Sequence, residues 1–131
     1  MEKSNSKQRI LVMDDDRDIL DAMKMVLEYN GYRVETCTND QRIDYSNPPD
    51  LFLVDIWMSG LNGSDVCKRL KSNDHTGHIP VIIVSANRNI REISEECKAD
   101  GYIAKPFNLN QLLAVISHHL NGKKCIESVK I

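Results

Sequence analysis

Residues 10–16 read ILVMDDD, an unbroken apolar run that ends in three aspartates. Similar runs end on polar residues at three later places: LFLVD at 51–55, VIIVS at 81–85 and YIAKP at 102–106. An apolar run without alternation is typical of a strand that is buried on both faces. Parallel neighbours would place their carboxyl ends at one edge of a sheet, where open α/β sheets bind ligands. The sequence therefore predicts a shallow site that combines carboxylates, a hydroxyl and an ammonium group.

Helical patterns separate these predicted strands. After Asp16, a residue type that caps helices, apolar side chains recur at a helical spacing until Asn30 and Gly31, which are typical of helix ends. Asn108 and Gln111 have the spacing of a capping box. The patterns predict strands at residues 9–13, 32–37, 51–55, 81–85 and 102–104, and helices after Asp16 and at 65–72, 88–98 and 109–120. This alternation indicates an α/β fold, a parallel sheet with helices on both faces.

Two stretches lack a clear pattern. Residues 38–49 have few apolar side chains, and Pro48 and Pro49 cannot continue a helix. We expect one or two helical turns and a loop there. Residues 57–63 contain two glycines and are expected to form a second loop.

The composition is that of an ordinary globular domain. The chain has 131 residues, 41% hydrophobic and 27% charged, which suits one domain with a buried core. A net charge of −2 without a basic stripe argues against a nucleic-acid partner. No apolar stretch approaches the roughly 18 residues of a membrane span, and the N-terminus lacks an apolar signal core. We therefore expect a cytoplasmic domain at residues 9–121, between a flexible leader at 1–8 and a frayed tail at 122–131.

The four cysteines, Cys37, Cys67, Cys97 and Cys125, lie about thirty residues apart along the chain. This spacing contains no C-x-x-C pair or other pattern typical of a metal site. We expect reduced thiols, with Cys67 and Cys97 packed as small apolar side chains on helices.

Asp14, Asp15 and Asp16 form an acidic cluster directly after the first predicted strand. Carboxylates packed together raise one another's pKa and oppose folding unless a cation offsets their charge. Mg²⁺ suits such a place, because it takes one or two carboxylates and keeps room for water and phosphate oxygens. We interpret Asp14 and Asp15 as metal ligands and Asp16 as the helix cap. A calcium-binding EF-hand starting at Asp14 is excluded, since Ile19 and Met25 occupy its required glycine and glutamate positions.

Three further polar residues end predicted strands. Asp55 has no packing or capping reason to follow a buried run, and a carboxylate can attack phosphorus to form an aspartyl phosphate beside a metal ion. Ser85 can donate a hydrogen bond to one phosphoryl oxygen, and Lys105 can place its charge beside another. Each alone has an ordinary structural explanation, but together they predict a site for a divalent cation and a phosphoryl group.

These motifs resemble the receiver domain of two-component response regulators. The resemblance covers roughly residues 9–120 and rests on the acidic residues after the first strand, the segment 50–63, Ser85-Ala86 and the segment 102–107. It implies a flavodoxin-like, doubly wound five-stranded parallel sheet of strand order 2-1-3-4-5. It also implies that the receiver domain, residues 9–121, accepts a phosphoryl group from a histidine kinase or phosphotransfer protein. Such a domain is not an enzyme toward other substrates; it catalyses only its own phosphorylation and dephosphorylation.

The same resemblance assigns roles to single residues. Asp55 is the phosphoacceptor. Asp15 binds Mg²⁺ directly, Asp14 binds it largely through water, and Asp55 and the backbone carbonyl of Trp57 complete the protein ligands. Lys105 matches the family's lysine, and its peptide bond to Pro106 is of a kind that is commonly cis in receivers.

The resemblance also implies a conformational switch. Ser85 moves toward the phosphoryl group, and Tyr102, the switch aromatic, swings into the space behind it. The movement alters the surface made by the family's fourth helix, fifth strand and fifth helix. A downstream protein is expected to bind that surface, and a homodimer through the same face is left open.

Several positions depart from the family pattern. Ser59 stands where proline is usual, and Lys98 stands where a helix-ending glycine is usual. Trp57 is bulky for a place beside a phosphoryl group, and our hypothesis is that its indole screens the group from water. The segments before Asp55 and before Lys105 are short, so the family's second and fourth helices are expected to be trimmed.

Two other functions fit part of the sequence. The first is a phosphatase whose nucleophile lies in the Asp14-x-Asp16 motif, but Asp18 replaces the expected threonine or valine and no substrate-capping segment is present. The second is an interaction module that is never phosphorylated, although such modules usually lose an acidic or lysine position that this chain keeps. We expect no output domain in this chain, since few residues follow Leu120.

Overall fold

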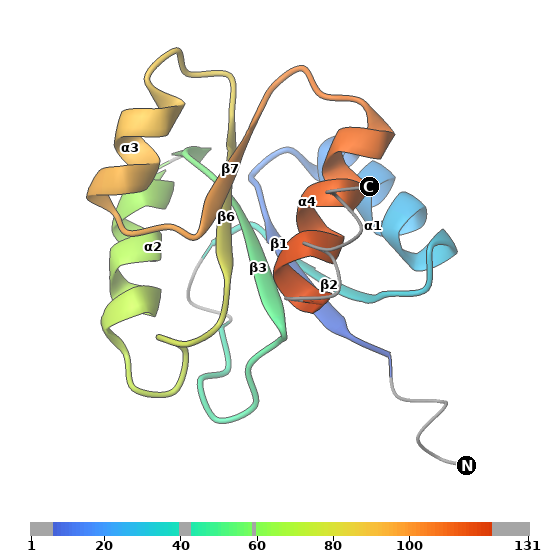
Figure 1. Cartoon of the computed structure of the whole chain (residues 1–131), viewed down its shortest axis with the longest axis horizontal. Coiled ribbons are helices and arrows are strands. Elements are labelled where there is room, and N and C mark those ends of the chain that lie inside the picture. Colours follow the sequence, from blue (N-terminus) through green and yellow to red (C-terminus); the bar gives the residue numbers. More distant parts are fainter. Residues whose placement is uncertain (1–6, 40–42, 59, 122–131) are drawn as a thin grey trace.

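A central parallel sheet organises the molecule. The computed structural model describes residues 7–39, 43–58 and 60–121. Five strands pair in the order β2-β1-β3-β6-β7 (Figure 1), which confirms the predicted 2-1-3-4-5 order because the short β4 and β5 form a separate hairpin. The elements are β1 (Arg9–Met13), α1 (Arg17–Tyr29), β2 (Arg33–Cys37), β3 (Leu51–Asp55), β4 (Trp57–Met58), β5 (Leu61–Asn62), α2 (Gly63–Ser72), β6 (Val81–Ser85), α3 (Ile90–Glu96), β7 (Gly101–Ala104) and α4 (Leu109–Asn121).

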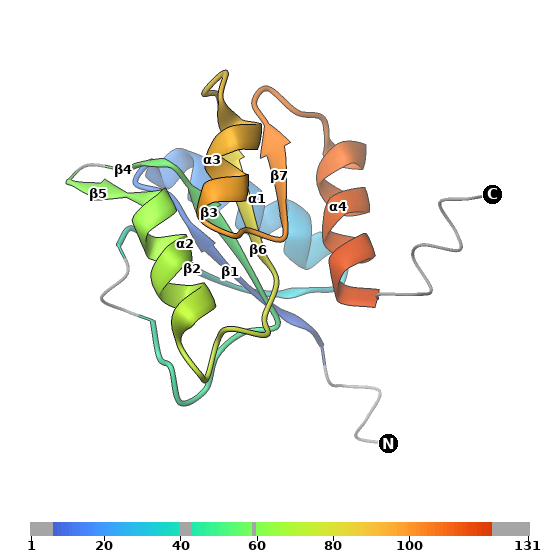
Figure 2. The same cartoon turned by 60° about the vertical axis from the view of Figure 1, so that its left-hand side comes forward.

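Helices cover both faces of this sheet, as predicted. The pair α1 and α4 lies on one face and the pair α2 and α3 on the other, which the two views in Figures 1 and 2 show from different sides. Each strand of the centre contributes alternate side chains to two apolar cores, so Ile10 and Val12 contact one pair of helices while Leu11 and Met13 contact the other. The non-alternating runs in the sequence follow from this two-sided burial. No helix in the described part of the chain is long and apolar enough to span a membrane.

The strand register aligns the functional ends. Met13 pairs with Val54, so Asp14 and Asp55 follow neighbouring strands at the same level. Ser85, the last residue of β6, pairs with Ala104, the last residue of β7. Lys105 therefore follows β7 beside the end of β6. The four strand ends therefore meet at one edge, as the sequence predicts.

The predicted helix caps are confirmed. The Asp16 carboxylate accepts hydrogen bonds from the backbone N–H groups of Asp18 and Ile19 at 2.9 and 3.4 Å. Asn108 and Gln111 exchange reciprocal side-chain-to-backbone hydrogen bonds of 2.8 and 2.9 Å, the capping box expected before α4.

The expectation of helical turns at residues 38–49 is wrong for the residues described there. Residues 38, 39 and 43–49 contain no helix; Asp44 instead opens a turn, in which its carboxylate accepts bonds from the backbone N–H and the hydroxyl of Ser46. An aspartate that bonds the backbone two residues ahead favours a turn over a helix. Pro48 and Pro49 then keep the chain extended into β3.

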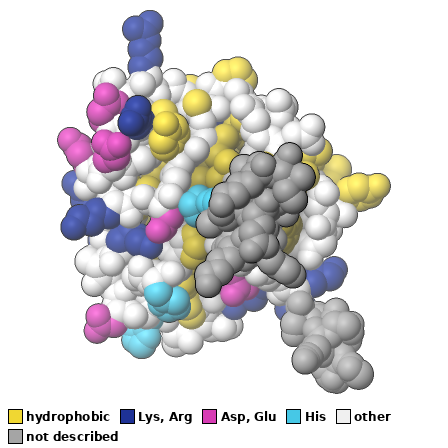
Figure 3. Space-filling model, in the orientation of Figure 1, with side chains coloured by type: hydrophobic (Ala, Val, Ile, Leu, Met, Phe, Trp, Pro, Cys, Tyr) yellow, Lys and Arg dark blue, Asp and Glu magenta, His cyan; other side chains and the backbone are white. Residues whose placement is uncertain are grey.

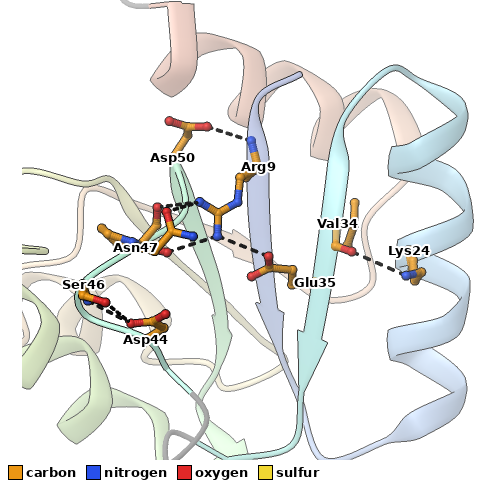
Figure 4. A network of polar contacts seen from close by, with 9 residues as sticks. Arg9, Lys24, Val34, Glu35, Asp44, Ser46, Asn47 and Asp50 are labelled. Carbon is orange, nitrogen blue, oxygen red and sulfur yellow. Dashed lines mark hydrogen bonds and ion pairs between the residues drawn. The ribbon is translucent and has the colours of Figure 1, made fainter. Parts of the chain in front are cut away.

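Arg9 anchors this non-helical segment to the sheet (Figure 4). Its guanidinium donates to the side-chain and backbone oxygens of Asn47 at 3.2 and 3.1 Å and to the carbonyl of Pro48 at 3.1 Å. A further bond of 3.2 Å joins it to Glu35 on β2, and the Asp50 carboxylate accepts the Arg9 backbone N–H at 2.7 Å. A single side chain thereby joins β1, β2 and the loop that leads to β3.

Replacing Arg9 with methionine is expected to lower the free energy of unfolding by about 2 kcal/mol, because charged hydrogen bonds to carbonyls are lost while the apolar stem is kept. Urea unfolding of the variant measures this change. Arg33→Met is the matched control, since Arg33 is an exposed arginine on the neighbouring strand and its loss should change the free energy by less than about 0.5 kcal/mol. Equal effects of the two substitutions would contradict the anchoring role.

The loop predicted at 57–63 is more ordered than expected. Trp57 pairs with Asn62 and Met58 with Leu61, so β4 and β5 form a small antiparallel hairpin. The Asn62 side chain accepts the N–H of Ser64 at 2.8 Å, and α2 begins at Gly63, two residues earlier than predicted. Ser59 lies outside the described residues.

The helix between β6 and β7 is short. The helix at this place, α3, has seven residues, Ile90–Glu96, and is shorter than the predicted 88–98. Lys98, just beyond it, adopts a left-handed conformation with φ of 63°. Glycine adopts this conformation without the steric cost that lysine incurs. Most of the predicted leader and the whole predicted tail lie outside the described residues.

Candidate functional site

Three carboxylates converge at the carboxyl edge of the sheet. Asp14 and Asp15 follow β1, and Asp55 is the last residue of β3. One carboxylate oxygen from each lies within 4.8 Å of the other two. Asp14 and Asp55 are 4% and 8% exposed, whereas Asp15 is open to solvent. Two buried acids beside an exposed third form a strongly negative cluster.

Lys105, the residue after β7, places a positive charge beside this cluster of carboxylates. Its ammonium nitrogen lies 3.5 Å from Asp14 Oδ2 and 3.9 Å from Asp55 Oδ1. One lysine offsets part of the charge of three carboxylates and leaves the cluster negative. A divalent cation would therefore be attracted to it.

Backbone groups fix the orientation of the buried acids. The N–H groups of Ile56 and Trp57 donate to the Asp55 carboxylate. Asp14 Oδ1 accepts the N–H of Asp16 at 3.0 Å, just before the first turn of α1. Both carboxylates are thus held in place by the chain that immediately follows their strands.

The pKa of Asp55 is raised to about 6, first by burial and then by the nearby charge of Asp14, while Lys105 and the two N–H donors oppose the shift. At neutral pH the group is still mostly ionised. It is also poorly solvated and close to a like charge. A cation would relieve this unfavourable state, and the site is electrostatically prepared to receive one.

Asp55→Asn is expected to stabilise the metal-free protein at neutral pH. Because the pKa of Asp55 is higher in the folded state than its ordinary value of 3.8, its contribution to stability is present below about pH 4 and lost as the pH rises through about 6. At about pH 7.5 in a chelator, the variant should therefore exceed the wild type by about 2–3 kcal/mol. At about pH 4 the difference should vanish. Urea unfolding at both pH values checks this, and a wild type that is the more stable protein at pH 7.5 would contradict the shift.

Ser85 is the last residue of β6, the strand next to β3. Its side chain is fully buried, and its hydroxyl accepts the N–H of Asn87 at 3.1 Å. Its carbonyl accepts the N–H of Lys105 at 2.9 Å, which ties the ends of β6 and β7 together. The Lys105–Pro106 peptide bond is cis, as the resemblance implies. Ser85 and Lys105 are thus placed side by side, as predicted.

Two predicted residues lie outside the buried cluster. Tyr102, on β7, points its ring outward and is 41% exposed. The Trp57 side chain, on β4, is 62% exposed, while its N–H reaches Asp55. The role of the Trp57 carbonyl as a metal ligand stays a prediction.

The donor set suits Mg²⁺. All three groups offer carboxylate oxygens, the ligand type this cation prefers, and two oxygens bound to one Mg²⁺ lie at most about 4.2 Å apart. The spread of 4.8 Å in the cluster is close to that limit. Because Asp15 is solvent-exposed, it leaves room for water and phosphate oxygens in the coordination shell.

Three supporting groups were not predicted from the sequence. They are the N–H donors of Ile56 and Trp57, the N–H of Asn87, and Gly63, whose N–H donates to the carbonyl of Ile56 at 2.9 Å. Backbone donors leave no trace in side-chain identity, so the sequence could not reveal the first two. Gly63 did carry a signal, since it is the first residue of α2 after the Asn62 cap, and glycine is unfavourable within a helix.

Comparison with known proteins gives a consistent result. The family model of the response regulator receiver domain matches residues 10–117. The nisin biosynthesis regulatory protein NisR of Lactococcus lactis is 38% identical over 121 residues, which cover 88% of this chain and 52% of NisR. The response regulator MprA of Mycobacterium sp. (strain KMS) is 35% identical over 111 residues, which cover 81% of this chain and 47% of MprA. The chain thus spans about half the length of these relatives.

Solved structures share the fold over nearly their whole length. A CheY-like response regulator receiver domain protein from Methanospirillum hungatei superposes with a TM-score of 0.77 at 29% identity, covering 91% of this chain and 98% of that one. The response regulator TrrA from Thermotoga maritima, solved in complex with Mg²⁺-BeF, has a TM-score of 0.78 at 28% identity, covering 86% and 99%.

Proposed function

Since this chain belongs to the response regulator receiver domain family, we propose that it accepts a phosphoryl group on Asp55 from a histidine kinase or a phosphotransfer protein. The observation that carries the proposal is the cluster of three carboxylate oxygens within 4.8 Å, with the Lys105 ammonium beside two of them. Receiver domains are signalling domains, and the chemistry proposed here is confined to the chain's own phosphorylation and dephosphorylation. The location that suits these partners is the cytoplasm.

Asp55 is the nucleophile in the proposed reaction. One carboxylate oxygen attacks the phosphorus of a phosphohistidine, the P–N bond breaks, and an acyl phosphate forms on Asp55. The N–H groups of Ile56 and Trp57 orient the carboxylate. Bound Mg²⁺ supplies charge neutralisation at the phosphoryl oxygens. Asp14, Asp15, Asp55 and the backbone carbonyl of Trp57 are the proposed ligands.

Lys105 and Ser85 are proposed to bind the transferred group. The Lys105 ammonium lies beside Asp55 and can pair with one phosphoryl oxygen. The Ser85 hydroxyl accepts a bond from Asn87, so its own proton can be donated to a second oxygen. A phosphoryl group that adds about −1.5 to −2 charges would draw both groups toward it.

The proposed output is a change at the surface of α3, β7 and α4. Tyr102 is exposed on β7, two residues before Ala104, which pairs with Ser85 of β6. Movement of Ser85 toward the phosphoryl group would open space into which the Tyr102 ring can turn. A downstream protein, or a second copy of this chain, would read the altered face.

The proposal is tested by the fluorescence of Trp57, the only tryptophan in the chain, which lies two residues from the acceptor. Addition of a small acyl-phosphate donor in the presence of Mg²⁺ should change its emission, and the change should decay as the phosphoryl group hydrolyses. The same addition in a chelator should leave the emission constant. A response that needs no divalent cation would contradict the proposed chemistry.

Trp57 is also proposed to lengthen the phosphorylated lifetime. Its indole is large and 62% exposed, and it belongs to the residue two positions after Asp55, from where it could obstruct an attacking water molecule. Trp57→Asn is expected to speed dephosphorylation several-fold, and Trp57→Phe, which keeps an apolar ring, should retain most of the lifetime. Loss of phosphate from the three proteins, followed by intact mass, measures this. Equal rates for asparagine and tryptophan would exclude the screening role.

A further inference from the structure

Two cysteines from different helices meet on the face of the sheet covered by α2 and α3. Cys67 lies on α2, and Cys97 caps the C-terminal end of α3. The Cys67 thiol donates to the carbonyl oxygen of Cys97 at 3.3 Å, and the Cys97 thiol donates to the carbonyl oxygen of Ser94 at 3.6 Å. Both are free, and neither takes part in the acidic cluster. Close approach of two thiols that are distant in the sequence is the first condition for a disulfide.

The two thiols are chemically unequal. The neighbouring Cys67 thiol lowers the pKa of Cys97, although burial opposes the shift. The neighbouring Cys97 and burial both raise the pKa of Cys67. Since the thiolate is the reactive form, Cys97 is the nucleophile of the pair and Cys67 is its partner.

A positively charged cavity adjoins Cys97. It has a volume of about 490 Å³ and lies between α2 and the end of α3, with Lys68, Lys71, Ser72, Glu96 and Lys98 around Cys97. Lysine and arginine side chains gather on this side of the molecule in Figure 3. Lys71 is ion-paired with Asp100 at 2.8 Å, so Lys68 and Lys98 face Glu96 alone and leave the lining positive. A positive lining favours a thiolate and attracts anionic reagents.

Cys97 can be reached through the end of α3. Both thiols are fully buried, so a reagent reaches Cys97 only when the last turn of this seven-residue helix opens. The hydroxyl of Ser94, on the same turn, is the one buried side-chain oxygen or nitrogen without a hydrogen-bond partner in the described part of the chain. Opening lets water reach this hydroxyl, which lowers the cost of exposing Cys97.

We propose that Cys97 and Cys67 form a peroxide-sensitive dithiol site, remote from the phosphoacceptor. The Cys97 thiolate attacks one oxygen of a hydroperoxide, the O–O bond breaks, and a sulfenic acid forms as hydroxide or alkoxide leaves. The Cys67 thiolate then attacks the sulfenic sulfur and releases hydroxide, which takes up the proton given by the thiol. Two thiols are thereby oxidised to a disulfide, and the peroxide is reduced to two molecules of water or to water and an alcohol. The disulfide joins α2 to the end of α3.

Hydrogen peroxide titration of the full chain tests this site. A Cys37→Ala, Cys125→Ser background leaves only the proposed pair. Intact mass should show the loss of two hydrogens, thiol titration should fall from two groups to none, and dithiothreitol should reverse both. Persistence of both thiols at peroxide concentrations that oxidise free cysteine would overturn the proposal.

Single substitutions in that background separate the two roles. Cys67→Ala should halt the reaction at a sulfenic acid on Cys97, which dimedone traps as one adduct. Cys97→Ala should leave Cys67 unreactive to peroxide and dimedone. Alanine fills both buried sites without a polar group, and thermal unfolding verifies that each variant is folded. Equal reactivity of the two single variants would contradict the assignment of Cys97 as nucleophile.

The role of the cavity is tested by the charge of the probe. In the Cys67→Ala background, we compare Cys97 modification by a dianionic aromatic disulfide, dithiobis(nitrobenzoate), with modification by neutral dithiodipyridine. Lys68→Met with Lys98→Gly should slow the anionic probe several-fold relative to the neutral one. Lys68→Arg with Lys98→Arg, which keeps both charges, should not. An unchanged ratio in the first variant would exclude the cavity as the route to Cys97.

Discussion

Gly63→Ala is expected to disrupt the acceptor site more than any other single methyl group added to the described glycines. A Cβ at this position would overlap the carbonyl oxygen of Asp55 and would lie 2.8 Å from the carbonyl carbon of Asp55 and 2.9 Å from the Cα of Ile56. These are backbone atoms, so no side chain can rotate away to make room. Either α2 or the segment that follows Asp55 must move.

The consequences reach both stability and chemistry. Overpacking against rigid backbone costs about 3 kcal/mol, and a displacement of about 1 Å in reacting groups can slow a reaction roughly a hundredfold. We therefore expect Gly63→Ala to lower the unfolding free energy by about 3 kcal/mol and to slow phosphorylation of Asp55 at least about a hundredfold. Urea unfolding and the rate of acyl-phosphate labelling measure the two effects.

Gly60→Ala is the matched control for this prediction. Gly60 lies between β4 and β5, three residues before Gly63, and has a left-handed φ of 70°, but no atom lies within 4 Å of a Cβ built there. Alanine should cost only the conformational strain, about 1–2 kcal/mol, and phosphorylation should continue. A Gly63→Ala protein that is as stable and as readily phosphorylated as the control would show that the close approach is unimportant.

Asp14→Asn is expected to slow phosphorylation of Asp55 at least a hundredfold at limiting Mg²⁺. The substitution removes one of the three carboxylates while keeping the side chain's size and its ability to accept the N–H of Asp16. Loss of one preorganised charged group of an active site typically costs about 10²–10³ in rate. Chelation of the metal should have an equal or larger effect on the wild type. Acyl-phosphate labelling over a Mg²⁺ titration measures both.

Asp16→Asn provides the control for charge. Asp16 is two residues away and caps α1 through bonds to Asp18 and Ile19, a role that asparagine fills equally well. Asp16→Asn removes the same formal charge from the same segment as Asp14→Asn. Because Asp16 is outside the cluster of three carboxylates, the labelling rate of this variant should stay near that of the wild type. If Asp14→Asn and Asp16→Asn lost equal rate, general charge rather than a specific ligand would explain the effect.

The sheet was predictable because its strands are buried on both faces. LFLVD and VIIVS have no alternation to confuse with a helix, and their polar last residues mark the edge where β3 and β6 end. The convergence of Asp14, Asp55, Ser85 and Lys105 then follows from parallel neighbours. Strand order came from the resemblance, since alternation of strands and helices is compatible with several orders.

The errors arose where long-range contacts override local pattern. Residues 43–49 form a turn and an extended run that are held by Arg9, a residue thirty-eight positions before Asn47. No local pattern reveals such a partner. The hairpin of Trp57–Met58 and Leu61–Asn62 was missed because two-residue strands carry too little alternation to recognise.

The sequence could predict only which side chains carry the proposed chemistry. Asp55 could be singled out because a charged group ends a buried run without a structural reason. Its N–H donors, its burial and the proximity of Asp14, which together set its pKa, depend on the folded chain. The outward position of Tyr102 likewise needed coordinates, because an aromatic residue on an edge strand can face either way.

The most direct test of the central claim is the intact mass of the protein after incubation with Mg²⁺ and a small acyl-phosphate donor. The account predicts one added phosphoryl group on the wild type and none on Asp55→Asn, while Asp14→Asn is labelled slowly. An adduct that survives Asp55→Asn but disappears with Asp14→Asn would instead place the nucleophile on β1, as in a phosphatase. An unlabelled wild type would contradict phosphoryl acceptance altogether and leave a module that acts by binding alone.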